Sequence, residues 1–184
     1  ESTDIIGRLT KQAANVFTLQ EGIPVIGGGA DNATSAIGMG VLTEGDVQSS
    51  IGTSGTILSP RSQPNPDTKM RLHSFCHCVP DKWYLMGTII SAGSSLSWIR
   101  SILCNTNVPT YDQFTNETRS VPIGSDGLIF LPYIMGERTP HNDSNARGVF
   151  FGLHSTHTRA HMIRAVMEGV CFALKDSVEL ITSL

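Results

Sequence analysis

Apolar residues recur every three or four positions over the last part of the chain, from about Thr158 to Leu184. This spacing places them on one face of an α-helix. Thr158 stands at the start of the run and is a residue type that favours the N-cap position. The pattern therefore predicts a long amphipathic helix, whose apolar face consists of Met162, Ile163, Val166, Met167, Val170, Leu174, Val178 and Ile181.

Shorter apolar runs, separated by glycine, proline and polar residues, fill the rest of the sequence and predict strands. Small-residue helices are expected over 31–39 and from 91 onward, with loops over 61–67 and 137–147. Because helices follow and separate the strands after two early hairpins, the order of elements predicts an α/β fold. The expected strands cover residues 23–26, 47–51, 56–59, 72–79, 83–90, 127–132 and 148–152.

The organisation of the chain indicates part of a larger protein. The sequence begins at Glu1 without Met, and no strand follows the final helix. We therefore expect an unfinished sheet. The polar segment 42–46 is expected to be a hinge that divides residues 1–42 from residues 43–184.

Composition and charge narrow the classes of function. The chain has 13 Lys and Arg against 16 Asp and Glu, for a formal charge of −3, and no basic stripe that could neutralise a nucleic-acid backbone. No apolar run reaches the roughly 18 residues that span a bilayer. We expect neither a nucleic-acid partner nor a membrane segment. The uneven spacing of the cysteines predicts buried thiols in a reducing cytoplasm, and these residues are Cys76, Cys78, Cys104 and Cys171.

The turn Gly52-Thr53-Ser54-Gly55 is the first candidate for chemistry. It resembles a G-x-S-x-G nucleophile elbow, but Thr56 ends it and a strand follows instead of a helix, which disfavours a serine hydrolase. Glycines let successive backbone N–H groups converge on an anion, and the hydroxyls of Thr53 and Ser54 can donate as well. The residues alone leave open whether this is an anion site or an ordinary tight turn.

The run Gly93-Ser94-Ser95 at the start of the second small-residue helix is another candidate anion site. A helix N-terminus offers unpaired N–H groups and a favourable dipole. Close packing of the helix on the sheet would explain the small residues equally well. Neither a G-x-x-x-x-G-K-[ST] loop nor a G-x-G-x-x-G helix start is present.

Asp31 is the lone carboxylate in a glycine- and alanine-rich junction between a strand and a helix. A carboxylate at the carboxyl end of a strand is well placed to act as a base, because ligand clefts of α/β proteins form there. Asp is also a favoured N-cap. Both roles stay open at this point.

Two clusters of titratable residues favour structural roles. The first cluster consists of His73, Cys76, His77 and Cys78. On a strand, Cys76 and Cys78 would face one side and His77 the other. No second Cys or His pair follows at zinc-ribbon spacing, so we expect no metal site. The loop 137–141 is expected to be a solvated connection in which Glu137 pairs with Arg138. Capping or surface positions are expected for His154, His157 and His161.

Taken in order, these pieces resemble the FGGY family of carbohydrate kinases over the whole chain. Residues 148–153 and, seven residues later, residues 161–168 fit the family's C-terminal signature at every constrained position. Within the family, residues 72–77 and 131–141 are most similar to the xylulose kinases, with gluconate, ribulose and glycerol kinases as alternatives. Further likeness to the family lies in residues 29–33, 50–55 and 92–98.

The resemblance implies a partial actin-like (ribonuclease H-like) ATPase fold. Residues 1–42 would be the tail of the sugar-binding lobe, and residues 43–184 most of the nucleotide-binding lobe. The implied reaction transfers phosphate from ATP, with Mg²⁺, to a sugar hydroxyl, with D-xylulose as the first candidate. By this likeness Asp31 is the catalytic base and Asn32 contacts the sugar, while Ala30 replaces a glycine that some relatives have. The nucleotide contacts implied are Gly52, Thr53, Ser54, Gly55 and Gly93.

The same likeness implies a cytoplasmic enzyme and allows a homodimer. The family's first phosphate loop and main sugar contacts would precede Glu1, and its adenine-binding segment would follow Leu184. We therefore expect the 184-residue chain alone to lack kinase activity. The rival functions are a non-enzymatic interaction domain with an actin-like core and a chaperone-type ATPase. The pair Asp31-Asn32 together with the signature favours the sugar kinase.

Overall fold

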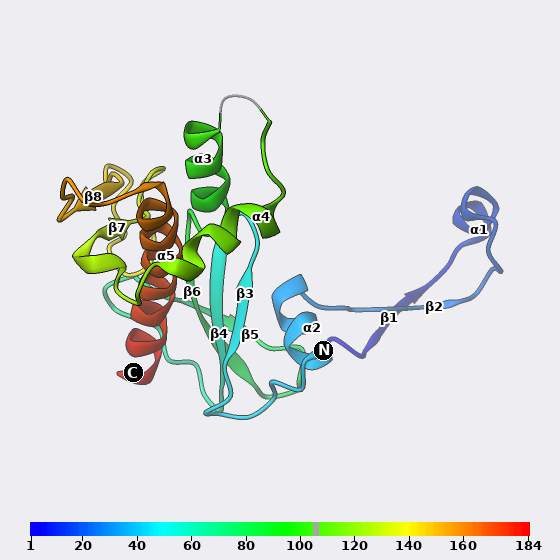
Figure 1. Cartoon of the computed structure of the whole chain (residues 1–184). Coiled ribbons are helices and arrows are strands. Elements are labelled where there is room, and N and C mark those ends of the chain that lie inside the picture. Colours follow the sequence, from blue (N-terminus) through cyan, green and yellow to red (C-terminus); the bar gives the residue numbers. More distant parts are fainter. Residues whose placement is uncertain (105–106) are drawn as a thin grey trace.

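A four-stranded antiparallel sheet forms the centre of the structure (Figure 1). The computed structural model describes residues 1–104 and 107–184. The strands β4 (Gly55–Arg61) and β6 (Trp83–Ile89) pair along their whole length, from Gly55 opposite Ile89 to Arg61 opposite Trp83. The strand order across the sheet is β3 (Gln48–Ile51), β4 (Gly55–Arg61), β6 (Trp83–Ile89) and β5 (His73–Cys76).

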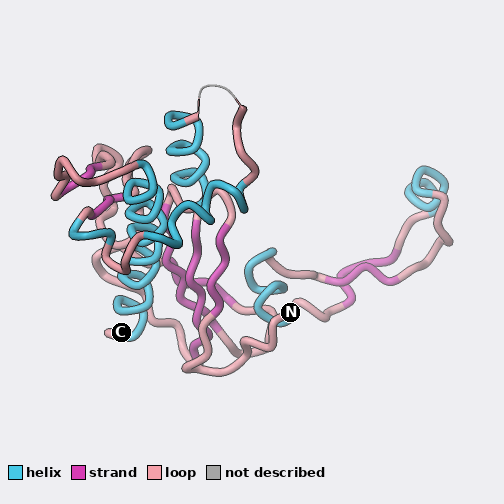
Figure 2. The backbone as a smooth tube through the Cα atoms, viewed as in Figure 1, coloured by secondary structure: helices cyan, strands magenta, loops and turns pink. Residues whose placement is uncertain are grey.

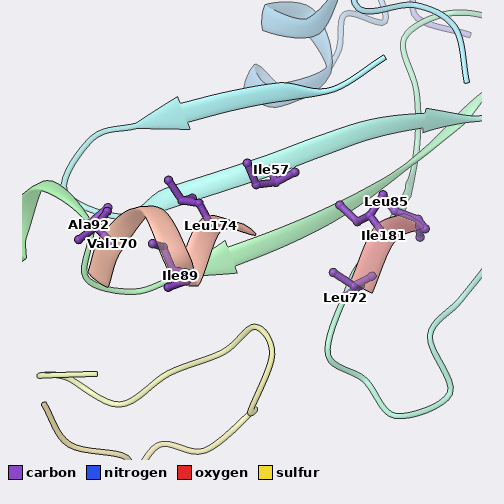
Figure 3. Close-up of a cluster of buried hydrophobic side chains, with 9 residues drawn as sticks. Ile57, Leu72, Leu85, Ile89, Ala92, Val170, Leu174 and Ile181 are labelled. Atoms are coloured by element: carbon purple, nitrogen blue, oxygen red, sulfur yellow. The ribbon is translucent and has the colours of Figure 1, made fainter. Parts of the chain in front are cut away.

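The long C-terminal helix α5 (Arg159–Thr182) covers one face of this sheet. Successive residues of a strand point to opposite faces, so Ile57 of β4 and Leu85 and Ile89 of β6 all point to the side of α5. The buried cluster that results is drawn in Figure 3. It consists of Ile57, Leu72, Leu85, Ile89, Ala92, Val170, Ala173, Leu174 and Ile181.

The short helix α2 (Asp31–Gly38) packs on the opposite face of the sheet. The neighbouring strand residues Leu58 and Tyr84 point to this side and bury Ala33 and Ala36 of the helix. Figure 1 shows α2 and α5 on either side of the central strands. The result is a three-layer arrangement with one layer only eight residues long.

A second, two-stranded sheet lies against the first half of α5. Its strands β7 (Ile129–Leu131) and β8 (Val149–Phe151) are antiparallel. The strand residue Phe130 is buried with Ile163 and Val166 of α5. The connecting elements are α3 (Gly93–Leu103), α4 (Tyr111–Asn116) and the 3₁₀ turns η1 (Glu117–Ser120) and η2 (Ser125–Gly127).

The helix α5 reaches β7 so closely that Gly169 has no room for a side chain. A Cβ at Gly169 would lie 2.2 Å from the carbonyl oxygen of Phe130. Alanine normally stabilises a helix by about 1 kcal/mol over glycine, but here a backbone atom occupies the space. We expect Gly169→Ala to lower the free energy of unfolding by about 1–3 kcal/mol, measured by urea denaturation. The control is Gly38→Ala in α2, where nothing lies within 4 Å of the added Cβ; equal losses for both variants would contradict the packing argument.

Residues 1–30 form an arm that extends away from the sheet (Figures 1 and 2). The strands β1 (Ile5–Arg8) and β2 (Pro24–Ile26) pair as an antiparallel hairpin, and α1 (Lys11–Phe17) lies at its tip. Large apolar side chains on the arm are exposed, among them Ile6, Val16 and Phe17. The sequence pattern predicted the strand at 23–26 but not its partner or the helix.

The predicted long helix is confirmed, with Thr158 as its N-cap. The backbone N–H of Thr158 donates to Nδ1 of His161 at 3.1 Å, so the capping role expected for His161 is also confirmed. One member of the predicted apolar face, Met167, is exposed instead. Within the described ranges, every helix is too short or too polar to cross a membrane.

The predicted strand at 72–79 ends early, at Cys76. The N–H of His77 donates to the carbonyl of Lys82 at 2.8 Å and closes a turn, so Cys76 and Cys78 do not share a strand face. The prediction that all four thiols are buried is wrong. Cys78 and Cys104 are buried, but Cys76 at the end of the edge strand and Cys171 of α5 are exposed.

Candidate functional site

The turn between β3 and β4 is fastened to the start of α3. The carbonyl oxygen of Gly52 accepts from the N–H of Gly93 at 2.9 Å. The carbonyl oxygen of Thr53 accepts from the N–H groups of Ala92 at 3.0 Å and Ser94 at 3.1 Å, and from the Ser94 hydroxyl at 2.9 Å. Two segments that are about 40 residues apart in the sequence therefore form one rigid unit.

This bonding corrects the expectation for the helix start. The N–H groups of Gly93 and Ser94 are not free for an anion, because they donate to the turn, and the N–H of Ser95 donates to the carbonyl of Ala92 at 3.0 Å. The glycine is needed for close approach: a Cβ at Gly93 would lie 2.5 Å from the Gly52 carbonyl oxygen. The N–H of Gly93 is thus taken up by the turn, and the nucleotide contact expected of Gly93 stays a prediction.

The free donors lie on the turn itself. The N–H of Gly52 donates to Ser54 across the turn at 2.9 Å, while within the described residues the N–H groups of Thr53 and Ser54 have no acceptor. All three residues are exposed. A Cβ at Gly52 would meet only the Ser54 carbonyl, at 3.9 Å. The outer side of the turn is therefore open, with two unpaired N–H groups and two hydroxyls.

A hollow of about 420 Å³ lies beside the turn. Its far side comes from α3 and α4, where the Ser97 hydroxyl and the Tyr111 hydroxyl are 2.8 Å apart and the guanidinium carbon of Arg100 lies 4.3 Å from the Tyr111 ring centre. The hydrogen bond from Ser97 and the nearby charge of Arg100 lower the pKa of Tyr111. The lining residues are Gly52, Thr53, Gly93, Ser94, Leu96, Ser97 and Tyr111.

Gly55, the last residue of the turn, is buried and faces the core. A Cβ there would lie 2.9 Å from Ile89 and 3.0 Å from Leu174. Its lack of a side chain is explained by packing. The nucleotide contact expected of Gly55 stays a prediction, and only its backbone could make such a contact.

Asp31 is the first residue of α2, and the N-cap is Ala30. The alternative that Asp31 caps the helix is therefore wrong. Its carboxylate oxygen Oδ1 accepts from the backbone N–H of Asn32 at 2.7 Å and from the side-chain amide of Asn32 at 3.2 Å. The side chain is exposed, so this carboxylate is available to a ligand, and the helix dipole favours its negative charge.

Small residues fix the place of Asp31 over the sheet. A Cβ at Gly29 would lie 1.9 Å from Sγ of Cys78. Ala33 is buried in the same cluster as Tyr84 of the sheet. Burial raises the pKa of Tyr84, and the charges of Cys78 and Asp31 raise it further. The charge of the Asp31 carboxylate thus adds to the effect of burial on the Tyr84 hydroxyl.

The structure brings together some of the expected site residues and not others. Gly52, Thr53 and Gly93 line the hollow beside the turn, whereas Asp31 and Asn32 are not among the described residues that line it. Leu96, Ser97 and Tyr111 also line the hollow. Leu96 and Ser97 lie in the stretch 92–98 that resembles the family, but no role was predicted for either. Tyr111 belongs to a different helix, and no sequence motif pointed to it. Within residues 1–104 and 107–184, no three His, Cys, Asp or Glu side chains gather as a metal site would require.

The C-terminal domain of the FGGY family of carbohydrate kinases matches residues 47–184. The chain is 42% identical over 180 residues to the xylulose kinase of Bacillus subtilis (strain 168), covering 98% of this chain and 36% of that kinase. It therefore spans little more than a third of the length of this relative.

Solved structures give the same result. The xylulose kinase from Rhodospirillum rubrum matches with a TM-score of 0.87 and 34% identity, over 97% of this chain and 36% of that one. The gluconate kinase from Lactobacillus acidophilus matches with a TM-score of 0.91 and 31% identity, over 100% of this chain and 37% of that one. The expected α/β class and partial actin-like fold are confirmed. The chain belongs to the FGGY family of carbohydrate kinases.

Proposed function

We propose that this chain is part of an ATP-dependent sugar kinase, with D-xylulose as the first candidate for the acceptor. The observation that carries the proposal is the open turn at residues 52–54, which presents unpaired N–H groups beside a hollow. The likeness to a xylulose kinase at 42% identity supports the choice of sugar. The likeness to a gluconate kinase keeps gluconate as the second candidate, followed by ribulose and glycerol.

The turn fits the phosphates of a nucleotide. The N–H groups of Thr53 and Ser54 point to no protein acceptor within the described chain, and their hydroxyls add two more donors. Such preorganised donors stabilise negative charge on a transferring phosphoryl group. Gly93 contributes by holding the Gly52 carbonyl at 2.9 Å, which fixes the direction in which the turn faces.

Asp31 is proposed as the general base. Its exposed carboxylate can accept a hydrogen bond from the attacking sugar hydroxyl, orient it, and take its proton late in the transfer. Asn32 is held against that carboxylate by its own amide at 3.2 Å and is proposed to contact the sugar. Mg²⁺, when bound with ATP, would neutralise phosphate charge. Because the described residues offer no cluster of ligands for it, we propose that phosphate oxygens and water hold the ion.

The division into a sugar-binding part at 1–42 and a nucleotide-binding part at 43–184 stays a prediction. So do a cytoplasmic location and a homodimer. We propose that closure of two lobes brings Asp31 to the turn, since Asp31 is not among the described residues that line the hollow beside it. The segment 42–46 between them is a turn held by the Asp46 carboxylate, which accepts from the Thr43 hydroxyl at 2.7 Å.

The test is a coupled assay of the full-length protein that contains this chain, with ATP, Mg²⁺ and a panel of pentuloses and sugar acids. We expect ADP release that depends on added sugar and is fastest with D-xylulose. The 184-residue chain serves as a control and should show no sugar-dependent ADP release. ADP release that does not depend on any sugar would favour a chaperone-type ATPase, and none at all would favour an interaction domain.

A further inference from the structure

Glu137 is a buried carboxylate in a loop that the sequence predicted to be solvated. Its exposed fraction is 2%. The expected pairing with Arg138 is wrong: Arg138 is exposed, and the ion pairs among the described residues do not include Glu137. A buried acid without a cationic partner is costly and calls for an explanation.

One carboxylate oxygen of Glu137 holds the backbone where β6 ends. Oε1 accepts from the N–H of Ile90 at 2.9 Å and from the N–H of Arg138 at 2.8 Å. Ile90 directly follows β6, whose last residue is Ile89. The side chain therefore takes the place of a neighbouring strand just beyond the end of the ladder.

The loop that carries Glu137 is itself fixed to the sheet. The N–H of Thr139 donates to the carbonyl of Thr88 at 3.0 Å, and the Thr139 hydroxyl accepts from the N–H of Thr88 at 3.1 Å while donating to the carbonyl of Arg71 at 2.6 Å. Thr139 is fully buried. Glu137 thus reaches Ile90 from a rigid base.

The bond to Ile90 lies three residues before Gly93. In this segment the N–H of Ala92 donates to the Thr53 carbonyl, and the N–H of Gly93 donates to the Gly52 carbonyl. A shift of the backbone at Ile90 would move these donors and with them the turn. Glu137 is therefore linked to the open turn through a short, continuous piece of backbone.

The second carboxylate oxygen, Oε2, is buried and has no partner within the described residues. The hydroxyl of Ser91, which follows Ile90 in the sequence, is also buried without a partner among these residues. Burial raises the pKa of Glu137, while the bonds from Ile90 and Arg138 act against that rise. What the acid provides at this cost is the acceptor for the N–H groups of Ile90 and Arg138, which an apolar residue would leave unpaired.

We propose that Glu137 is a positioning residue for the nucleotide turn, holding Ile90 and so the segment 90–94 where Gly93 meets Gly52. The inference rests on the proposed function, since it assumes that the turn at 52–54 binds phosphate. Glu137 is not among the described residues that line the hollow, so it acts through the backbone N–H groups that it holds.

The test compares Glu137→Leu, Glu137→Gln and Glu137→Asp in the full-length protein, with KM for ATP, KM for the sugar, kcat and thermal unfolding measured for each. Leu removes the acceptor and leaves the Ile90 N–H unpaired, so KM for ATP should rise about tenfold or more, with KM for the sugar within about twofold. Gln retains an acceptor oxygen and should stay near wild type. Asp is shorter by one methylene, so its oxygen lies farther from the Ile90 N–H and KM for ATP should rise as well. This variant provides the test if the Leu variant does not fold.

Thr139→Val is the matched control from the same loop. It removes the bonds of the hydroxyl to Thr88 and Arg71 but keeps the backbone bond from residue 139 to the Thr88 carbonyl. It should therefore lower the unfolding temperature without a selective change in KM for ATP. The proposal is overturned if the Leu and Asp variants, like Thr139→Val, lose stability but keep the wild-type KM for ATP. A wild-type protein that binds no ATP would overturn the proposed function itself, whereas normal wild-type binding with an unchanged Asp variant would overturn this inference alone.

Discussion

Replacing Asp31 by asparagine is expected to lower kcat of the full-length protein by roughly 10²–10⁴-fold, the loss typical of a missing general base. The amide keeps the size of the side chain and can still accept from Asn32 at the position of Oδ1. It cannot take a proton from the sugar hydroxyl. The affinity for ATP should barely change, because Asp31 does not line the hollow beside the turn.

A suitable control for Asp31 is Asp112, an exposed aspartate in the first turn of α4. Asp112→Asn makes the same chemical change in the same kind of helix position, so kcat should stay within about twofold of wild type. Steady-state kinetics and isothermal titration with ATP measure both effects. An Asp31→Asn enzyme that keeps more than half of the wild-type kcat would remove Asp31 from the role of base.

The sequence predicted well those elements whose signal is local. The helix over residues 159–182 follows from apolar spacing alone, and the hairpin at residues 48–61 from two apolar runs around a glycine turn. Both depend on contacts near in sequence, which a periodicity records. The arm at residues 1–30 was largely missed, because its strands are short and its apolar residues stay exposed, so no alternation between buried and exposed positions marks them.

For the site, the sequence identified the residues but not their roles. Gly93 was expected to offer its N–H to an anion, but only the fold brings the Gly52 carbonyl within 2.9 Å of it. Asp31 was equally consistent with a cap, and the choice depended on the helix starting at Asp31 itself, one residue earlier than a capping role requires. Glu137 was expected to be solvated. The expectation failed because the bond that holds its side chain reaches Ile90, 47 residues away, and leaves no local pattern in the sequence. For Gly93 and Glu137 a long-range contact decided the role, and for Asp31 the exact start of a helix did; single-sequence patterns contain neither.

The close approach of Gly93 to Gly52 leads to the second large expected effect. In Gly93→Val, the added Cβ would lie 2.5 Å from the Gly52 carbonyl oxygen. That oxygen belongs to the backbone and cannot swing aside as a flexible side chain could. Either the hydrogen bond between the two residues breaks or the turn moves, and both outcomes turn the N–H groups of Thr53 and Ser54 away from their present direction.

We therefore expect Gly93→Val to weaken ATP binding by about tenfold or more while the affinity for the sugar persists. Calorimetry on the full-length protein measures both affinities, with circular dichroism to verify folding. The control is Gly7→Val on β1 of the arm, where nothing lies within 4 Å of the added Cβ. Gly52→Val should also weaken ATP binding, but for another reason: its Cβ has space, so the side chain would fill the hollow in front of the turn without straining it. A folded Gly93→Val protein with wild-type affinity for ATP would show that nucleotide binding does not depend on the direction of this turn.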